Sequence, residues 1–304
     1  MKDRIKIGEL PELRILQLNR ILLHEYPDRR RAASLLKSMK SLGILKNPPV
    51  VGIIRPLNEN IYSRTENGGE LINPFISENG IEFILLDGTN RISALRELGC
   101  RDALVQIIDF YDEKLIISKW SHTLEKFEKD RLLHQLFKIK GVEIKENENS
   151  KASRTCEGNT ALCRITFRDE SQCIILSESE LLARTSALKS ITGLYINNPW
   201  MDRVSYTNLN YLKINYPSFS ALLSFQGFEK NEILFMARNG IKIPGGVTRV
   251  VLPKRALLFN ISLKFLMEEI PINEKNSILQ TMISEKIKNK SIRFYQEPTF
   301  HFDE

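Results

Sequence analysis

The residues with the clearest capacity for chemistry form one short run, Asp87-Gly88-Thr89-Asn90-Arg91. The run lies between an apolar segment, Phe83 to Leu86, and an amphipathic segment, Ile92 to Leu98, so it is predicted to join a strand to the start of a helix. A helix N-terminus carries unpaired N–H groups and partial positive charge, so a glycine, a hydroxyl and an arginine there suit a phosphate. Asp87 could hold Mg²⁺ against that phosphate. A polar turn that only caps the helix is the alternative.

Glu25 is a second candidate, in a segment that is predicted to be irregular. Pro27 disfavours helical geometry at Tyr26, and the helical spacing of apolar residues begins only after Arg29. Glu25 therefore lies in a loop just before a helix. The residues alone are compatible with a general base, but they favour a solvated acid that flanks the helix.

Another turn with chemical potential lies far downstream. Gly245 and Gly246 permit a close backbone approach to a ligand, and Thr248 and Arg249 follow them. These two side chains could bind a phosphate or a carboxylate, although an ordinary turn into a strand has the same composition.

Trp120 and His122 are further candidates for a pocket. Tryptophan is usually a core residue, and a single histidine is more often structural than functional. The sequence therefore leaves open whether Trp120 and His122 line a pocket or are structural residues.

The elements that must position the first-half candidates have an αβ pattern. A helix is expected from Arg29 to Leu42, with Gly43 as its stop, and strands are expected at 49–54, 83–86 and 103–108. The segment from Arg55 to Gly80 is rich in turn residues and is expected to be a surface insertion.

The second half gives mixed helices and strands. The patterns predict a helix over 121–140, a loop over 141–159, a hairpin around Asp169 and a helix over 178–191. Strands are expected near 250–252 and 256–263, and Asn273 is expected to cap a helix over 274–290. The fold class is therefore predicted to be α+β.

Composition limits the classes of function. The 304 residues suffice for two domains, and a net charge of +7 fits anionic ligands such as nucleotides. Lys and Arg are scattered among acids, so nucleic-acid binding is possible but has no specific support. The cysteines have no metal-site spacing and are expected to be free thiols in a reducing cytosol. The sequence shows no signal-peptide core and no membrane-spanning run, so a cytoplasmic protein is expected, and the oligomeric state is left open.

The order of motifs resembles the ParB/sulfiredoxin-like superfamily. The matching residues are Gly43-x-Leu45-x-x-Pro48, then a strand, then Asp87-Gly88-x-x-Arg91-x-x-Ala94-x-x-x-x-Gly99, then a strand. Within that superfamily the chain is similar to the free L-serine kinases, both the archaeal ADP-dependent type and the ATP-using siderophore-cluster type. The further matches are Leu23-His24-Glu25, Trp120-x-His122 and Pro244-Gly245-Gly246-Val247-Thr248-Arg249.

This resemblance implies that a nucleotide, ATP or ADP, donates a phosphoryl group to L-serine to give O-phospho-L-serine. It implies that Glu25 and Asp87 are catalytic, with Asp87 holding Mg²⁺. Nucleotide phosphates would be bound by Gly88, Thr89, Asn90, Arg91, Thr248 and Arg249, and substrate by Trp120 and His122. The product would feed a biosynthetic pathway, such as siderophore or diaminopropionate synthesis.

The chain also departs from its relatives. Many of them carry histidine in the turn where Thr89 and Asn90 stand, so a proton-transfer role there is lost or changed. Sulfiredoxin activity is improbable because the turn has no cysteine.

The resemblance also implies a ParB/sulfiredoxin-like nucleotide-binding domain at 1–125 and an α+β domain at 126–304, with the active site in the cleft between them. The alternative function is a non-catalytic ParB-like regulator that binds nucleotide or DNA.

Overall fold

The protein forms two compact units, and each is built from separate stretches of the chain. The structure, a computed structural model, describes residues 10–54, 62–64, 70–72, 81–146, 155–156 and 159–295. Unit 1 comprises Met1–Leu22, Arg29–Leu115 and Leu252–Glu304, and unit 2 comprises Leu23–Asp28 and Ile116–Val251. The sequence prediction placed a single boundary at residue 125, whereas the two units alternate along the chain.

Unit 1 is organised around a mixed five-stranded sheet with the order β1-β8-β4-β7-β2. Neighbouring strands alternate between antiparallel and parallel pairing across the sheet. The strands are β1 (Glu12–Gln17), β2 (Ile21–Leu22), β4 (Val50–Ile54), β7 (Glu82–Asp87) and β8 (Asp102–Asp109). Almost every position of β4 and β7 is buried, because their Val, Ile, Leu and Phe side chains fill the core.

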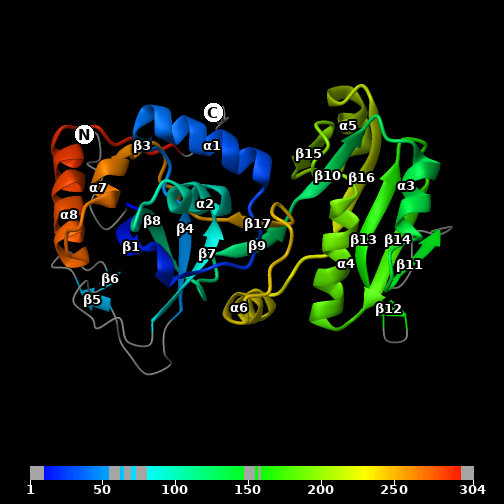
Figure 1. Ribbon diagram of the computed structural model, residues 1–304, viewed down its shortest axis with the longest axis horizontal. Helices are drawn as coiled ribbons and strands as arrows, with labels where there is room; N and C mark the ends of the chain where they lie inside the picture. The colour runs from blue at the N-terminus through cyan, green and yellow to red at the C-terminus, as the bar shows by residue number, and fades with distance from the viewer. Residues whose placement is uncertain are drawn as a thin grey trace. The chain divides into compact units, whose positions relative to one another are not determined.

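Helices from both ends of the chain cover this sheet. Helix α1 (Arg29–Leu42) packs on α2 (Thr89–Glu97), while α7 (Leu263–Met267) packs on β8 and α8 (Ile272–Lys288) on β1. Figure 1 shows the orange and red C-terminal helices beside the blue and cyan strands of the same unit. Short pairs complete the unit: β3 (Ile44–Leu45) with β18 (Ile261–Ser262), and β5 (Tyr62–Arg64) with β6 (Glu70–Ile72). A 3₁₀ turn, η2 (Leu18–Arg20), joins β1 to β2.

A buried ion pair fastens α8 to the sheet. The ammonium of Lys275 lies 2.6 Å from Asp102 Oδ2, and the Lys275 side chain is fully buried. Burial of a charge is tolerated only with a partner, so this pair fixes how α8 docks on β8.

Unit 2 is built on a larger antiparallel sheet with the order β11-β14-β13-β16-β10-β15, and β12 pairs with β13 at its edge. Figure 1 shows these strands in green and yellow-green. Their bounds are β10 (Ser121–Glu125), β11 (Val142–Glu146), β12 (Thr155–Cys156), β13 (Asn159–Phe167), β14 (Gln172–Glu178), β15 (Met201–Val204) and β16 (Phe219–Phe225). The helices are α3 (Lys129–Leu136), α4 (Leu181–Gly193), α5 (Leu209–Asn215) and α6 (Lys230–Arg238). A separate two-stranded ribbon joins β9 (Ile116–Lys119) to β17 (Thr248–Val251).

Several sequence predictions are confirmed, among them α1, the β7–α2 junction, the hairpin of β13 and β14, and α4. The helix expected over 121–140 was wrong at its start, because residues 121–125 form β10, an interior strand between β15 and β16. The loop expected over 141–159 contains β11, whose alternating exposed and half-buried residues have the period of a strand.

The C-terminal expectations also needed correction. Between 256 and 263 only β18 is a strand, and α8 begins at Ile272 with Pro271, not Asn273, at its N-cap. The insertion expected over 55–80 falls mostly outside the described residues. No helix in the described part of the chain is long and apolar enough to cross a membrane.

Candidate functional site

The Asp87 turn is the strand-to-helix junction that the sequence predicted. Strand β7 ends at Asp87, Gly88 is the N-cap with φ +102°, and α2 begins at Thr89. A Cβ at position 88 would lie 2.9 Å from the Pro49 Cβ, so both the conformation and the space require glycine. The first intrahelical bond runs from Ile92 N to Gly88 O, and the main-chain N–H groups before it belong to the first turn of α2.

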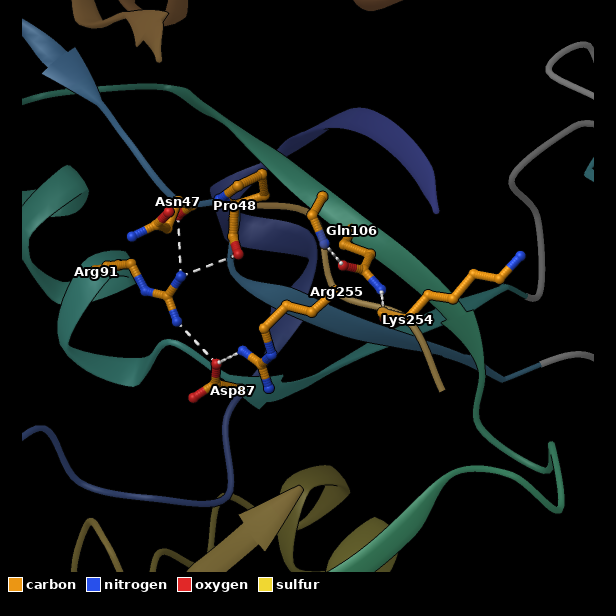
Figure 2. Close-up of polar contacts among 8 residues, drawn as sticks. Asn47, Pro48, Asp87, Arg91, Gln106, Lys254 and Arg255 are labelled. Carbon is orange, nitrogen blue, oxygen red and sulfur yellow. Dashed lines mark hydrogen bonds and ion pairs between the residues drawn. The ribbon is translucent and has the colours of Figure 1, made fainter. Parts of the chain in front are cut away.

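Two arginines converge on one carboxylate oxygen of Asp87. Arg91 Nη2 donates to Asp87 Oδ2 at 2.8 Å, and Arg255 Nη1 donates to the same oxygen at 2.5 Å. Arg91 Nη1 also donates to the carbonyls of Asn47 and Pro48, both at 3.0 Å. Figure 2 shows the two guanidinium groups on either side of Asp87. The turn therefore carries two fixed cations beside a helix N-terminus.

These cations keep Asp87 ionised. Burial raises the pKa of the carboxyl, but the charges and hydrogen bonds of Arg91 and Arg255 outweigh burial and lower the pKa to about 2. Asp87 is therefore negative throughout the physiological pH range.

The Asp87 turn could hold Mg²⁺ only together with a phosphate that supplies further oxygen ligands. Figure 2 shows the other carboxylate oxygen of Asp87, Oδ1, directed away from both arginines. The described residues contain no group of three or more His, Cys, Asp and Glu side chains that could hold a metal ion. Mg²⁺ commonly binds proteins through one carboxylate plus substrate phosphates and water, so Asp87 Oδ1 meets that requirement.

Glu25 belongs to unit 2, where its short segment pairs with the chain near Ile243. Tyr26 N donates to Ile243 O, and Ile243 N donates to His24 O, both at 2.9 Å. The Glu25 carboxylate accepts a hydrogen bond from Thr248 N at 3.2 Å and a short one from Thr248 Oγ1. His24 Nε2 lies 3.5 Å from the same hydroxyl. Glu25 is thus not the solvated acid that its sequence context favours.

Burial dominates the electrostatics of Glu25. The residue is only 9% exposed. Desolvation raises the pKa of its carboxyl to about 7, against the lowering effect of the hydrogen bonds from Thr248 and Gly246 and of the Arg203 charge. A carboxylate with a pKa near 7 can accept a proton at neutral pH and release it again, as a general base must.

The glycines of the Gly245-Gly246 turn let this loop approach other protein groups. A Cβ at Gly245 would collide with the Tyr26 carbonyl, and one at Gly246, where φ is +84°, would collide with the Arg203 side chain. Arg203 Nη2 donates to Asp28 Oδ2 at 2.9 Å and to Gly245 O at 3.2 Å. The loop that carries Thr248 is therefore fixed against the Glu25 segment.

The His122 side chain has a structural role. It is fully buried, its Nε2 lies 2.9 Å from Gly246 O, and its Nδ1 lies 3.0 Å from Tyr195 Oη. A carbonyl only accepts, so the proton is on Nε2 and Nδ1 accepts from the tyrosine hydroxyl. Burial lowers the pKa of His122 to about 4. Both ring nitrogens are thus engaged within the protein, Nε2 with the glycine loop and Nδ1 with Tyr195.

Trp120 and Arg249 form a pair next to this loop. The Arg249 guanidinium lies 5.0 Å from the centre of the Trp120 ring, and Trp120 N donates to Val247 O at 3.0 Å. Both residues are half-buried, so the guanidinium stays within reach of solvent and of a ligand.

The predicted residues therefore gather in two places. Unit 1 brings together Asp87 to Arg91, and unit 2 brings together Glu25, Trp120, His122, Thr248 and Arg249. Sequence reasoning missed Arg255 and Arg203. No spacing could have identified them, because Arg255 lies 168 positions from Asp87 and Arg203 lies 175 from Asp28.

No protein-family model matches this sequence, and no curated protein sequence matches it. Comparison with solved structures finds three informative matches. A C-terminally truncated SbnI from Staphylococcus aureus matches with a TM-score of 0.62 at 17% identity, over 90% of this chain and 96% of SbnI. A conserved hypothetical protein from Pyrococcus furiosus matches with a TM-score of 0.61 at 17% identity, over 84% and 97%.

The third match is a free serine kinase in complex with AMP, with a TM-score of 0.62 at 14% identity, over 84% of this chain and 94% of the kinase. Variants of that kinase with one glutamate replaced, in complex with AMP or ADP, match similarly. The mixed α+β prediction is confirmed, and this chain has the fold that SbnI and the free serine kinase share.

Proposed function

We propose that this protein is a free L-serine kinase that transfers a phosphoryl group from ATP or ADP to the serine hydroxyl, giving O-phospho-L-serine. The observation that carries the proposal is Glu25, a buried carboxylate with a pKa near 7, in a chain with the fold of a free serine kinase. Phosphoryl transfer needs positioning, charge neutralisation and a base near the attacking oxygen, and the described residues supply a candidate for each.

The donor side of the reaction is assigned to unit 1. The first turn of α2, with Gly88, Thr89 and Asn90, would offer main-chain N–H groups to the nucleotide phosphates. Arg91 and Arg255 would bind the phosphate oxygens with planar, doubly donating guanidinium groups. Asp87 would hold Mg²⁺ through Oδ1, and the metal would neutralise charge on the phosphates.

The acceptor side is assigned to unit 2. Glu25 would accept the proton of the serine hydroxyl as that oxygen attacks the terminal phosphorus and the bond to the leaving nucleotide breaks. Thr248, through its two donors to Glu25, would orient the carboxylate. Arg249, supported by Trp120, would bind the serine carboxylate. His122 is assigned to holding Gly246 in place.

A cytoplasmic location and a biosynthetic use of the product, such as siderophore or diaminopropionate synthesis, complete the proposal. The three cysteines whose side chains the structure describes are free thiols, as a reducing compartment maintains them.

The test is mass spectrometry of purified protein incubated with L-serine, Mg²⁺ and either ATP or ADP, with O-phosphoserine as the product measured. L-threonine and L-homoserine in parallel reactions would define the acceptor. Product with one donor supports the proposal. Nucleotide binding without product from any acceptor would contradict it and would favour a non-catalytic regulator.

A further inference from the structure

Gln106 is a buried amide in the middle of an apolar strand. It lies on β8, between β1 and β4, and its side chain is only 3% exposed. The surrounding strand residues, Leu104, Val105 and Ile107, are buried apolar side chains. A buried amide must find hydrogen-bond partners, so its presence here calls for a specific role.

The partners of Gln106 lie on one irregular segment. We call residues 253–260, which connect β17 to β18, the strap. Gln106 Nε2 donates to Lys254 O at 2.9 Å, and Ala256 N donates to Gln106 Oε1 at 2.8 Å. The orientation of the amide is fixed by its partners, since a carbonyl only accepts and a main-chain N–H only donates. Gln106 thus binds the main chain on both sides of Arg255, as Figure 2 shows.

The strap also has contacts farther from Arg255, among them the Lys286 ammonium 5.2 Å from the centre of the Phe259 ring. It has no regular secondary structure between residues 254 and 260. Farther along, Leu258 N donates to Asn47 Oδ1 at 2.9 Å and Asn260 N to Lys46 O at 3.2 Å. Of these hydrogen bonds, the two from Gln106 hold the main chain next to Arg255.

We propose that Gln106 is a positioning residue for phosphate binding, acting through Arg255. Its amide fixes the strap so that the Arg255 guanidinium stays beside Arg91 at the Asp87 turn, ready to bind a nucleotide phosphate. This inference rests on the proposed function, because it assigns the phosphate of the nucleotide donor to the two arginines. A guanidinium that is already in place loses less conformational freedom when the phosphate binds.

The first test measures ADP and ATP affinity by calorimetry in Gln106→Leu, Arg255→Ala and the double variant, at one fixed salt concentration. Loss of a charge-assisted hydrogen bond predicts affinity weakened by roughly tenfold to a hundredfold in Arg255→Ala. Gln106→Leu keeps the guanidinium but not its fixed position, so it should weaken affinity by a smaller factor, roughly severalfold. If Gln106 acts through Arg255, the double variant should bind no more weakly than Arg255→Ala. Unchanged affinity in either single variant, or a further loss in the double variant, would overturn the inference.

A matched control is available in the same unit. Asn276 also binds main chain with both ends of its amide, through Ile15 N at 2.8 Å and Ile15 O at 3.0 Å. Asn276→Leu removes a comparable, half-buried main-chain clamp away from the Asp87 turn and is expected to retain wild-type nucleotide affinity.

Hydrogen exchange of the nucleotide-free protein separates this inference from the proposed function. Gln106→Leu should accelerate exchange of the Ala256 amide, whereas Asn276→Leu should accelerate that of Ile15 instead. Unchanged exchange at Ala256 would overturn the inference even if nucleotide binds. If the wild-type protein binds no nucleotide, the proposed function and the phosphate role are both refuted. Faster exchange at Ala256 in Gln106→Leu would then still show that Gln106 holds the strap.

Discussion

The main-chain amide and the side-chain hydroxyl of Thr248 both donate to the carboxylate of Glu25, across 223 positions of sequence. Two donors on one carboxylate favour its ionised form, while burial favours the protonated form, and burial wins by enough to raise the pKa to about 7. The balance keeps Glu25 able to change protonation state near neutral pH.

Glu25→Gln is expected to preserve folding and nucleotide binding and to lower kcat by roughly a hundredfold or more, because the amide cannot accept the hydroxyl proton. In the wild type, kcat/KM should rise with pH and level off above a midpoint near 7, since only the deprotonated carboxylate acts as base. Initial rates of O-phosphoserine formation between pH 5 and pH 9 would check both statements.

Two other groups serve as controls for that pH profile. Burial also raises the pKa of Glu12 to about 7, but Glu12 lies on β1, which β8 and β4 separate from β7 and the Asp87 turn. Glu12→Gln should therefore leave the midpoint unchanged. Burial lowers the pKa of His122 to about 4, so the imidazole should show no titration between pH 5.5 and pH 8 by nitrogen NMR. A midpoint that moves in Glu12→Gln would remove Glu25 as the base.

The same carboxyl should make stability depend on pH. Folded Glu25 titrates near 7 and the unfolded chain near the ordinary 4.5, so between these values the folded state holds a proton that the unfolded state releases. The free energy of unfolding should therefore fall as pH rises through this window, by about 3 kcal/mol in total. Relative to the wild type, Glu25→Gln should become more stable by that order between pH 4.5 and pH 8. Urea denaturation at several pH values measures this difference, and a constant difference would contradict the prediction.

Gly246→Ala tests the close approach of the loop to Arg203. The new Cβ would collide with the guanidinium and would occupy a left-handed conformation, so a loss of about 3 kcal/mol or more is expected. Gly240→Ala is the matched control, because Gly240 has a φ of +67° but no atom within 4 Å of the added Cβ. That change should cost about 1 kcal/mol. Equal losses in urea denaturation would show that the collision is relieved at no cost.

Asp87→Asn separates metal binding from phosphate binding. The asparagine oxygen can still accept from Arg91 and Arg255, so ADP binding without metal should persist or strengthen as a negative charge is removed. The Mg²⁺ concentration for half-maximal activity should rise several-fold, because an amide oxygen is a weaker ligand for a hard cation. Calorimetry in chelator and a Mg²⁺ titration of activity check the two parts, and an unchanged Mg²⁺ requirement would exclude Asp87 as its ligand.

The features that the sequence predicted correctly depend on residues close together in the chain. The Asp87 turn was predictable because strand, glycine and helix follow one another within a few residues, and each signal has a local physical cause. Helix α1 was predictable for the same reason, since its apolar spacing and the stop at Gly43 are contiguous.

The features that the sequence did not predict depend on contacts between segments far apart in the chain. Residues 121–125 have helix-like charge spacing, but pairing with two neighbouring strands outweighs that local preference. Arg255 has no local signal at all, because its role depends on Gln106 of β8 and Asp87 of β7. The buried state of Glu25 likewise depends on the Thr248 loop, so its sequence context indicated a solvated acid.

The interleaved composition of the two units has a consequence for synthesis on the ribosome. All of unit 2 has been synthesised once residue 251 has been made, since its other segment, Leu23–Asp28, lies earlier in the chain. Unit 1 is completed later, because Asp102 is synthesised 173 positions before Lys275, its buried partner. Newly made β8 therefore presents an unpaired acid and an uncovered apolar face until α8 has been synthesised. Exposed apolar strands favour aggregation and chaperone binding, so unit 1 should be more vulnerable than unit 2 during synthesis.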